Sequence, residues 1–145
     1  MAKEGRSLSL MTGKEGEIKV IGKLLEKGFE VYIPVVDVGA DCIIKISTGE
    51  YKEIQIKTRK KTDAYFFDVS DVQPNENLFI LCYILTEPDD IWIIPSMDLK
   101  HLATQVKSGK KTKWRLTFGK RGSEKRKLFE KYRNNFALLK GSASS

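Results

Sequence analysis

The strongest constraint on the fold is a continuous apolar run at residues 77–86, NLFILCYILT. A strand with one solvated face alternates apolar and polar residues, whereas an unbroken apolar run is typical of a strand that is covered on both faces. A turn at 87–90 separates this run from a second apolar segment, IWIIP at 91–95. The two segments therefore predict a central strand and another strand beside it.

The other patterns along the 145 residues predict a single α+β domain at 1–140, in which helices flank a mixed central sheet. A capping box formed by Thr12 and Glu15 and a helix end at Gly28 predict a helix over 13–27, after a mobile arm at 1–11. Strands are expected at 29–34, 41–47, 51–58 and 114–118, and helices at 97–107 and 124–139. Residues 62–76 show no clear period, and 141–145 are expected to form a disordered tail.

Charge is distributed unevenly along the chain. Residues 1–99 carry 12 basic and 17 acidic side chains, whereas residues 100–145 carry 14 basic and 2 acidic ones, a net charge of +12. Such a basic segment favours a polyanionic partner. Nucleic acid is the first candidate for that partner, and an anionic membrane surface is the second.

Composition argues against several other classes of protein. No apolar run approaches the roughly 18 residues that cross a membrane, and the first ten residues lack the apolar core of a secretion signal. Cys42 and Cys82 lie in apolar runs, which predicts buried free thiols in a reducing compartment. We therefore expect a cytoplasmic, nucleoid-associated protein that is not secreted. Two distant cysteines and the single His101 do not supply the usual zinc site.

Glu17 departs from the amphipathic pattern of the first helix. The apolar stripe of that helix consists of Ile18, Val20, Ile21, Leu24 and Leu25. At about 100° per residue, Glu17 falls near the middle of the stripe. A carboxylate that faces a core is costly unless a cation or hydrogen bonds meet it. Glu17 is therefore either a site residue or a first-turn acid that the helix N-terminus stabilises and water reaches.

Polar side chains also gather on one face of the predicted hairpin. Glu53, Gln55 and Lys57 alternate with isoleucines, so the three share a face. The register that pairs apolar with apolar positions places Asp41 opposite Lys57 and Ile43 opposite Gln55. Asp41, Gln55 and Lys57 are therefore expected to converge on one patch.

The polar face of the hairpin also has a purely structural interpretation. The same register places Lys45 opposite Glu53, across an odd-length loop centred on Gly49. Opposite charges that face each other across two strands are common on solvated sheets. An ordinary solvated face with a Lys45–Glu53 pair is thus the alternative to a functional patch.

The combination resembles the active site of the PD-(D/E)XK nuclease superfamily, which includes many restriction enzymes, archaeal Holliday-junction resolvases and some homing endonucleases. The similarity covers about residues 12–60, in TGKEGEIKVIGKLLEKGFEVYIP, GADCII and EIQIKTR. It implies a restriction endonuclease-like core and a metal-dependent DNA endonuclease. Two positions differ from the family pattern: Gln55 replaces an acid, and Ala40 stands where the pattern has proline.

The resemblance implies catalytic roles for four residues. Asp41 would be the metal-binding aspartate, Gln55 stands at the (D/E) position, and Lys57 stands at the lysine. Glu17 matches the first-helix glutamate of the resolvase-like branch. Mg²⁺, or Mn²⁺ as its substitute, would be held by Asp41, the Gln55 side-chain oxygen and the Ile56 carbonyl, and Glu17 would hold a water or a second ion. Lys57 would orient or deprotonate the attacking water and stabilise phosphate charge.

Basic residues outside the motif are candidates for contacts with the DNA backbone, which add affinity but little specificity. Arg59, Lys60 and Lys61 follow the motif directly, and a solvated strand end is the alternative for them. The other candidates lie in the basic part at 100–140 and are Lys110, Lys111, Lys113, Arg115, Lys120, Arg121, Lys125, Arg126 and Lys127. Candidates for base stacking, for which core packing is favoured, are Tyr65, Phe66, Trp92 and Trp114.

Two other functions stay open at the level of sequence. A module that binds DNA without cutting it would keep the fold and the basic face, and Gln55 favours that alternative. A protein-interaction role would show no salt-sensitive affinity for DNA. A nuclease would act on a specific site or on a DNA structure such as a junction. Because one active site cuts one strand, we expect a homodimer or a higher symmetric oligomer.

Overall fold

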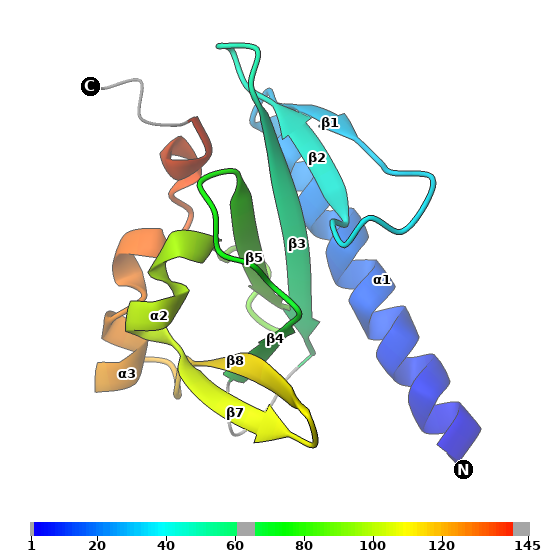
Figure 1. Ribbon diagram of the computed structural model, residues 1–145, viewed down its shortest axis with the longest axis vertical. Helices are drawn as coiled ribbons and strands as arrows, with labels where there is room; N and C mark the ends of the chain where they lie inside the picture. Colours follow the sequence, from blue (N-terminus) through cyan, green and yellow to red (C-terminus); the bar gives the residue numbers. More distant parts are fainter. Residues whose placement is uncertain (1, 61–65, 141–145) are drawn as a thin grey trace.

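A computed structural model describes residues 2–60 and 66–140 of the chain (Figure 1). Its central sheet has five strands in the order β1-β2-β3-β5-β6. The pair β3–β5 is parallel and the other neighbours are antiparallel. These strands are β1 (Glu30–Tyr32), β2 (Cys42–Lys45), β3 (Tyr51–Arg59), β5 (Leu78–Ile84) and β6 (Ile91–Pro95). The predicted α+β class with a mixed central sheet is confirmed.

The central strand has the environment that its apolar run predicts. Every residue of β5 is buried, between β3 and β6. The helix α1 (Ala2–Glu26) covers one face of the sheet around β3 (Figure 1). A second sheet covers the other face and has the order β4-β8-β7, with strands β4 (Phe66–Ser70), β8 (Lys111–Thr117) and β7 (Thr104–Ser108). Trp92 lies in the core beneath this second sheet, which confirms core packing as its role.

The first helix is longer than predicted and its buried stripe is narrower. It begins at Ala2, so the arm expected at 1–11 is helical over its described residues, and no proline interrupts that stretch. Val20 and Leu24 are fully buried, whereas Ile18 and Leu25 are exposed. No helix within the described ranges is long and apolar enough to cross a membrane.

The helix predicted at 97–107 ends early. The chain forms the short turn η1 (Ser96–Asp98) and the helix α2 (Leu99–Leu102), and then enters β7. Val106 therefore lies on a strand, where it pairs with Lys113 of β8. Pairing with another strand overrides the local helical pattern here, and β8 itself begins three residues before the strand predicted at 114.

The helix predicted at 124–139 is replaced by three short turns, α3 (Glu124–Lys127), η2 (Glu130–Tyr132) and η3 (Phe136–Lys140). Asn134 breaks the helix, because its φ is +55°. Its backbone N–H donates to the carbonyl of Ile91, and its side-chain oxygen accepts from the N–H of Ile91. The hydrogen bonds that a helix would make within itself thus go to β6.

Candidate functional site

The site forms beside β3, at the first residue of β2. β2 begins at Cys42, opposite Ile54, whereas β3 continues to Arg59 along α1 and β5 (Figure 1). The predicted register is wrong by two residues, because Lys45 lies opposite Tyr51. A shift of two keeps every side chain on its expected face. Asp41 is therefore level with Gln55 and not with Lys57.

The hairpin loop explains this shift. The Ile46 N–H donates to the Glu50 carbonyl, so the three-residue loop is 47–49 and is centred on Thr48 rather than on Gly49. Gly49 takes a φ of +91°, the left-handed conformation that such loops require at their last residue. The expected Lys45–Glu53 pair does not form, and the Lys45 ammonium lies 6.0 Å from the centre of the Tyr51 ring.

Asp41 lies just before β2 and pairs with the edge of β3, partly through its side chain. Its N–H donates to the Ile54 carbonyl at 2.8 Å, and its carboxylate Oδ2 accepts from the Ile56 N–H at 2.6 Å. The N–H and C=O of one strand residue point to the same side of the strand. The Ile56 carbonyl therefore faces the same edge as the Asp41 carboxylate.

The Gln55 side chain is held in one orientation. Its Nε2 donates to the Gly39 carbonyl at 2.8 Å, so its Oε1 is left as an acceptor. Gly39 has a φ of +85° and lies two residues before Asp41, in the loop from β1 to β2. Sequence reasoning missed Gly39, and the only signal for it was its place in the GAD segment.

These groups include the oxygen atoms of the predicted ligand set. A carboxylate, an amide oxygen and a backbone carbonyl are the hard ligands that Mg²⁺ prefers. Within the described residues, no group of three or more His, Cys, Asp or Glu side chains is placed to hold a metal. The predicted set contains only two such side chains, Asp41 and Glu17. Its other oxygens come from an amide and a backbone carbonyl, and this combination fits a hard divalent cation.

Glu17 lies on the buried side of α1, with its side chain 23% exposed and 3.5 Å from the Lys14 amine. Because the helix begins at Ala2, Glu17 is not a first-turn residue, and that alternative is wrong. Burial, and then the charges of Asp41 and Glu17, raise the pKa of the Cys42 thiol to about 12. The two carboxylates thus lie near the same thiol, at the start of β2.

The residue before Glu17 sets how closely α1 approaches β3. A Cβ on Gly16 would lie 2.0 Å from Thr58 Oγ1 and 2.6 Å from Thr58 Cβ, so the helix packs here directly on the strand. Thr58 Oγ1 is buried, with no hydrogen-bond partner in the described part of the chain. Sequence reasoning missed Gly16, although a glycine beside an inward acid was a usable signal.

Lys57 lies two residues beyond Gln55 on the same face of β3, a step of about 7 Å. It is half-buried and pairs in register with Cys82 of β5. Among the described residues, no carboxylate lies within ion-pair distance of its amine. The structure thus places an unneutralised cation beside the predicted ligand set.

Burial of the two thiols makes a testable prediction about their reactivity. Burial also raises the pKa of Cys82, and both cysteines are free and buried, as predicted. A thiol with a raised pKa stays protonated at neutral pH and reacts slowly. We expect a disulfide reagent such as dithionitrobenzoate to modify neither thiol in the folded protein and both after unfolding. Rapid modification of a folded thiol would contradict this packing.

The basic residues next to β3 meet on one aromatic ring. Arg59 and Arg115 lie 4.6 Å and 4.2 Å from the centre of the Phe66 ring. Arg115 also donates twice to Asp68, at 2.8 Å and 3.0 Å, and this pairing holds the pKa of Asp68 below its usual value. Phe66 therefore joins the end of β3 to β8. Lys61 and Tyr65 lie outside the described residues.

Arg126 differs from the expected surface contact. It is buried, and its guanidinium donates to Glu87 and to the Gly119 carbonyl, each at 3.0 Å. Its role is to hold α3 against the turn after β5. Residues that are exposed, as a DNA contact requires, are Lys60, Lys110, Lys111, Lys120, Arg121, Lys125 and Lys127. Lys113 is half-buried and lies 3.4 Å from Asp68.

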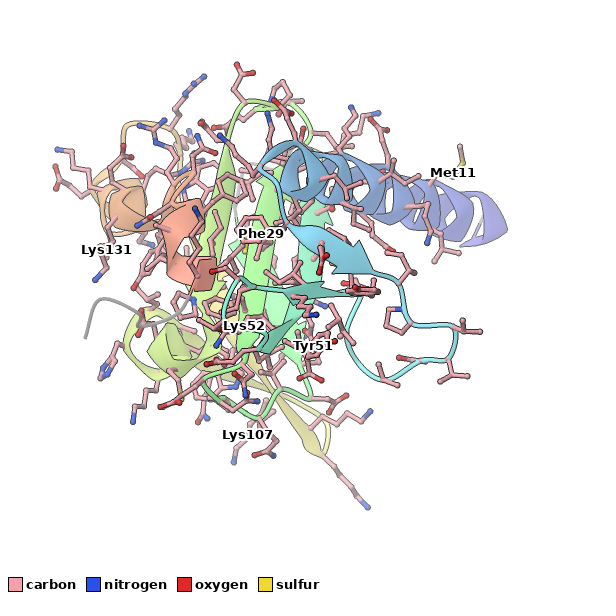
Figure 2. All side chains as sticks on the ribbon, turned by 90° about the horizontal axis from the view of Figure 1, so that it is seen from above. Met11, Phe29, Tyr51, Lys52, Lys107 and Lys131 are labelled. Atoms are coloured by element: carbon pink, nitrogen blue, oxygen red, sulfur yellow. The ribbon has the colours of Figure 1, made fainter. Side chains whose placement is uncertain are left out.

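A hollow of about 730 Å³ lies at the other end of β3, and none of the predicted site residues lines it. Lys52 borders this hollow from inside the molecule (Figure 2), where its amine donates to Asn77 at 3.1 Å and pairs with Glu50 at 3.4 Å. The predicted site therefore does not belong to this hollow, and Asp41, Gln55 and Lys57 are half-buried.

No protein-family model matches the sequence, and no curated protein matches it. Among solved structures, a bacterial homing endonuclease, I-Ssp6803I, is similar, with a TM-score of 0.63 over 92% of this chain and 93% of that chain. The sequence identity is 18%, so the similarity establishes a shared fold.

Proposed function

We propose that this protein is a metal-dependent DNA endonuclease of the PD-(D/E)XK type, with its active site at the edge of β3. The observation that carries the proposal is the Asp41 carboxylate, hydrogen-bonded to the Ile56 N–H beside a Gln55 amide held by Gly39. The shared fold with a homing endonuclease supports it, and so does the basic half of the chain. The DNA target is a specific site or a DNA structure.

Asp41, Gln55 Oε1 and the Ile56 carbonyl would hold Mg²⁺ or Mn²⁺, with Glu17 near a second position. When bound, the cation supplies Lewis-acid stabilisation of phosphate charge and lowers the pKa of a water. The hydrogen bonds from Ile56 to Asp41 and from Gln55 to Gly39 fix both side chains before any ligand arrives. Removing such supporting contacts typically lowers metal affinity or activity by about 10–100-fold.

Lys57 is the residue proposed to act on the attacking water and on the phosphate. In its ammonium form the side chain orients the attacking water and stabilises the charge that develops on the phosphate; only in its neutral form does the amine take the proton of that water. Exposed lysines and arginines hold the DNA backbone. Each chain has one such site, so cutting both strands requires a homodimer or a higher symmetric oligomer, acting on DNA in the cytoplasm.

The proposal is tested by incubating the protein with supercoiled plasmid, linear mixed-sequence DNA and a four-way junction. Each substrate is assayed with Mg²⁺, with Mn²⁺ and with EDTA. We expect cutting that needs metal and is lost in Asp41→Ala but not in Asp89→Ala, an exposed acid in a turn. Cutting that persists in EDTA or in Asp41→Ala would contradict the proposal.

A non-catalytic DNA-binding module is the second candidate, and the amide at Gln55 favours it because it removes one negative charge from the site. That module would bind all three DNAs in a salt-sensitive manner and cut none of them. Asp41→Ala would then leave its affinity for DNA unchanged.

The amide also gives a prediction about metal requirement. Gln55→Glu keeps the side-chain length and adds a ligand charge, although it loses the hydrogen bond to the Gly39 carbonyl. Because the added charge acts directly on the cation, we expect half-maximal cutting at about 10-fold lower Mg²⁺ concentration. Gln55→Leu, which has no side-chain oxygen, serves as the matched control and is expected to lose cutting. The measurement is a titration of the cleavage rate with Mg²⁺. An unchanged Mg²⁺ requirement in Gln55→Glu would show that this side chain does not hold the metal.

A further inference from the structure

The β7–β8 hairpin extends beyond the sheet to which it belongs. β4 pairs with β8 only from Lys113 to Thr117, whereas β7 pairs with β8 as far as Lys111. The strands are joined by a two-residue turn, in which Gly109 has a φ of +66°. The tip of the hairpin, residues 107–112, is therefore a two-stranded ribbon without a third strand, and it projects from the fold (Figure 1).

The ribbon carries charge of one sign. Residues 104–115 include five basic side chains and no acidic one. At its base, Asp68 of β4 pairs with Arg115 and with Lys113 and so fixes the strand. At the tip, Lys107 and Lys110 have no carboxylate within ion-pair distance among the described residues. One carboxylate therefore faces two cations at the base, and Lys111 lies 3.9 Å from Asp71, whereas Lys107 and Lys110 present their charge to solvent.

One face of the ribbon presents hydrogen-bonding side chains. Gln105 is opposite Trp114 and Lys107 is opposite Thr112, so these four side chains share a face. Gln105, Lys107 and Thr112 are exposed, and Lys107 lies at the periphery of the molecule (Figure 2). Glutamine pairs with adenine through two hydrogen bonds and lysine binds guanine, both at base edges in the major groove.

The ribbon is coupled to the proposed active site through packing. Arg115 at its base and Arg59 at the end of β3 contact the same Phe66 ring. Arg59 is two residues beyond Lys57, which is about 7 Å along the strand. The β7–β8 hairpin lies next to the end of β3 (Figure 1), so the proposal has one duplex contact both the site and the ribbon. The major groove, about 12 Å wide, admits a two-stranded ribbon.

We propose that the β7–β8 ribbon enters the major groove of duplex DNA and reads base edges through Gln105, Lys107 and Thr112. This inference rests on the proposed function in its choice of DNA as the partner. It adds sequence readout to a segment whose lysines would otherwise contribute only affinity for the DNA backbone.

The test uses the full chain in EDTA, so that binding is measured without cutting. Duplexes with a randomised centre are selected with the wild type, with Gln105→Ala, with Lys107→Ala and with Lys131→Ala. The control, Lys131, is an exposed lysine on η2, away from the ribbon (Figure 2). We expect the wild type and Lys131→Ala to enrich the same sequence, and each ribbon variant to lose discrimination at one or two positions by about 5–150-fold.

A second arm identifies the groove. Replacing guanine by 7-deazaguanine removes an acceptor from the major groove and nothing from the minor groove. We expect this change to weaken binding of the wild type about 10-fold and to leave Lys107→Ala unaffected. Identical enriched sequences in wild type and ribbon variants, or wild-type binding without any enriched sequence, would overturn the ribbon proposal alone, provided that plasmid is still cut. A wild type that neither binds nor cuts DNA would overturn the proposed function as well.

Discussion

Lys57→Ala is expected to slow DNA cleavage by about 10²–10⁴-fold, the range that general acid–base groups contribute. Affinity for the same DNA in EDTA should change by only a few-fold, because one lysine is a small part of a basic surface. The reason lies in its position, two residues beyond Gln55 on the same face of β3 and without an acidic partner among the described residues. The measurement is a single-turnover rate with Mg²⁺, beside a binding titration.

Lys45→Ala is the matched control for this substitution. Lys45 lies on the same sheet as Lys57, and its ammonium is 6.0 Å from the centre of the Tyr51 ring, remote from the Asp41 end of β2. Its loss should leave the cleavage rate within a few-fold of the wild type. If Lys57→Ala cuts at the wild-type rate, or if its loss of cutting follows only from unfolding, Lys57 has no role in the chemistry.

Gly16→Ala is expected to destabilise the fold by about 1–3 kcal/mol, the usual cost of overpacking. The added methyl would lie 2.6 Å from Thr58 Cβ, which is anchored to the backbone of β3, so a change of rotamer does not remove the clash. The helix must then move away from the strand. Because Glu17 is the next residue, cleavage should fall even at temperatures at which the variant is folded.

Gly22→Ala provides a control on the same helix. A Cβ on Gly22 meets nothing within 4 Å, so alanine should stabilise the protein by about 0.5–1 kcal/mol through its higher helix propensity. Thermal unfolding should therefore move in opposite directions for the two variants, by about 2–4 °C per kcal/mol. Shifts of the same sign would show that α1 does not pack against Thr58 as described.

Much of the fold and of the site follows from short-range patterns. The unbroken apolar run of β5 predicted its burial on both faces, and alternation placed Gln55 and Lys57 on one face of β3. The helical stripe placed Glu17 on the inward side of α1. These predictions succeed because the period of an element alone decides which side chains share a face.

The errors arise where the apolar pattern of a single element does not decide the structure. The hairpin register depends on the three-residue loop at Gly49, and a change of two residues preserves the apolar pattern, so the pattern cannot select between them. The last helix is broken because Asn134 pairs with Ile91, more than 40 residues away. The Asp41–Ile56 hydrogen bond requires β2 to begin at Cys42, directly after Asp41, which no local signal specifies.

Asp41, Gln55 and the Ile56 carbonyl are proposed to hold the metal ion that the cleavage of DNA requires. This proposal is tested most directly by replacing Mg²⁺ with Fe²⁺ in the presence of a mixed-sequence duplex, and by mapping where peroxide then breaks the polypeptide. We expect breaks near residues 39–42 and 55–57 that excess Mg²⁺ suppresses and Asp41→Ala abolishes. Breaks confined to other segments, or breaks at these positions that persist in Asp41→Ala, would contradict it.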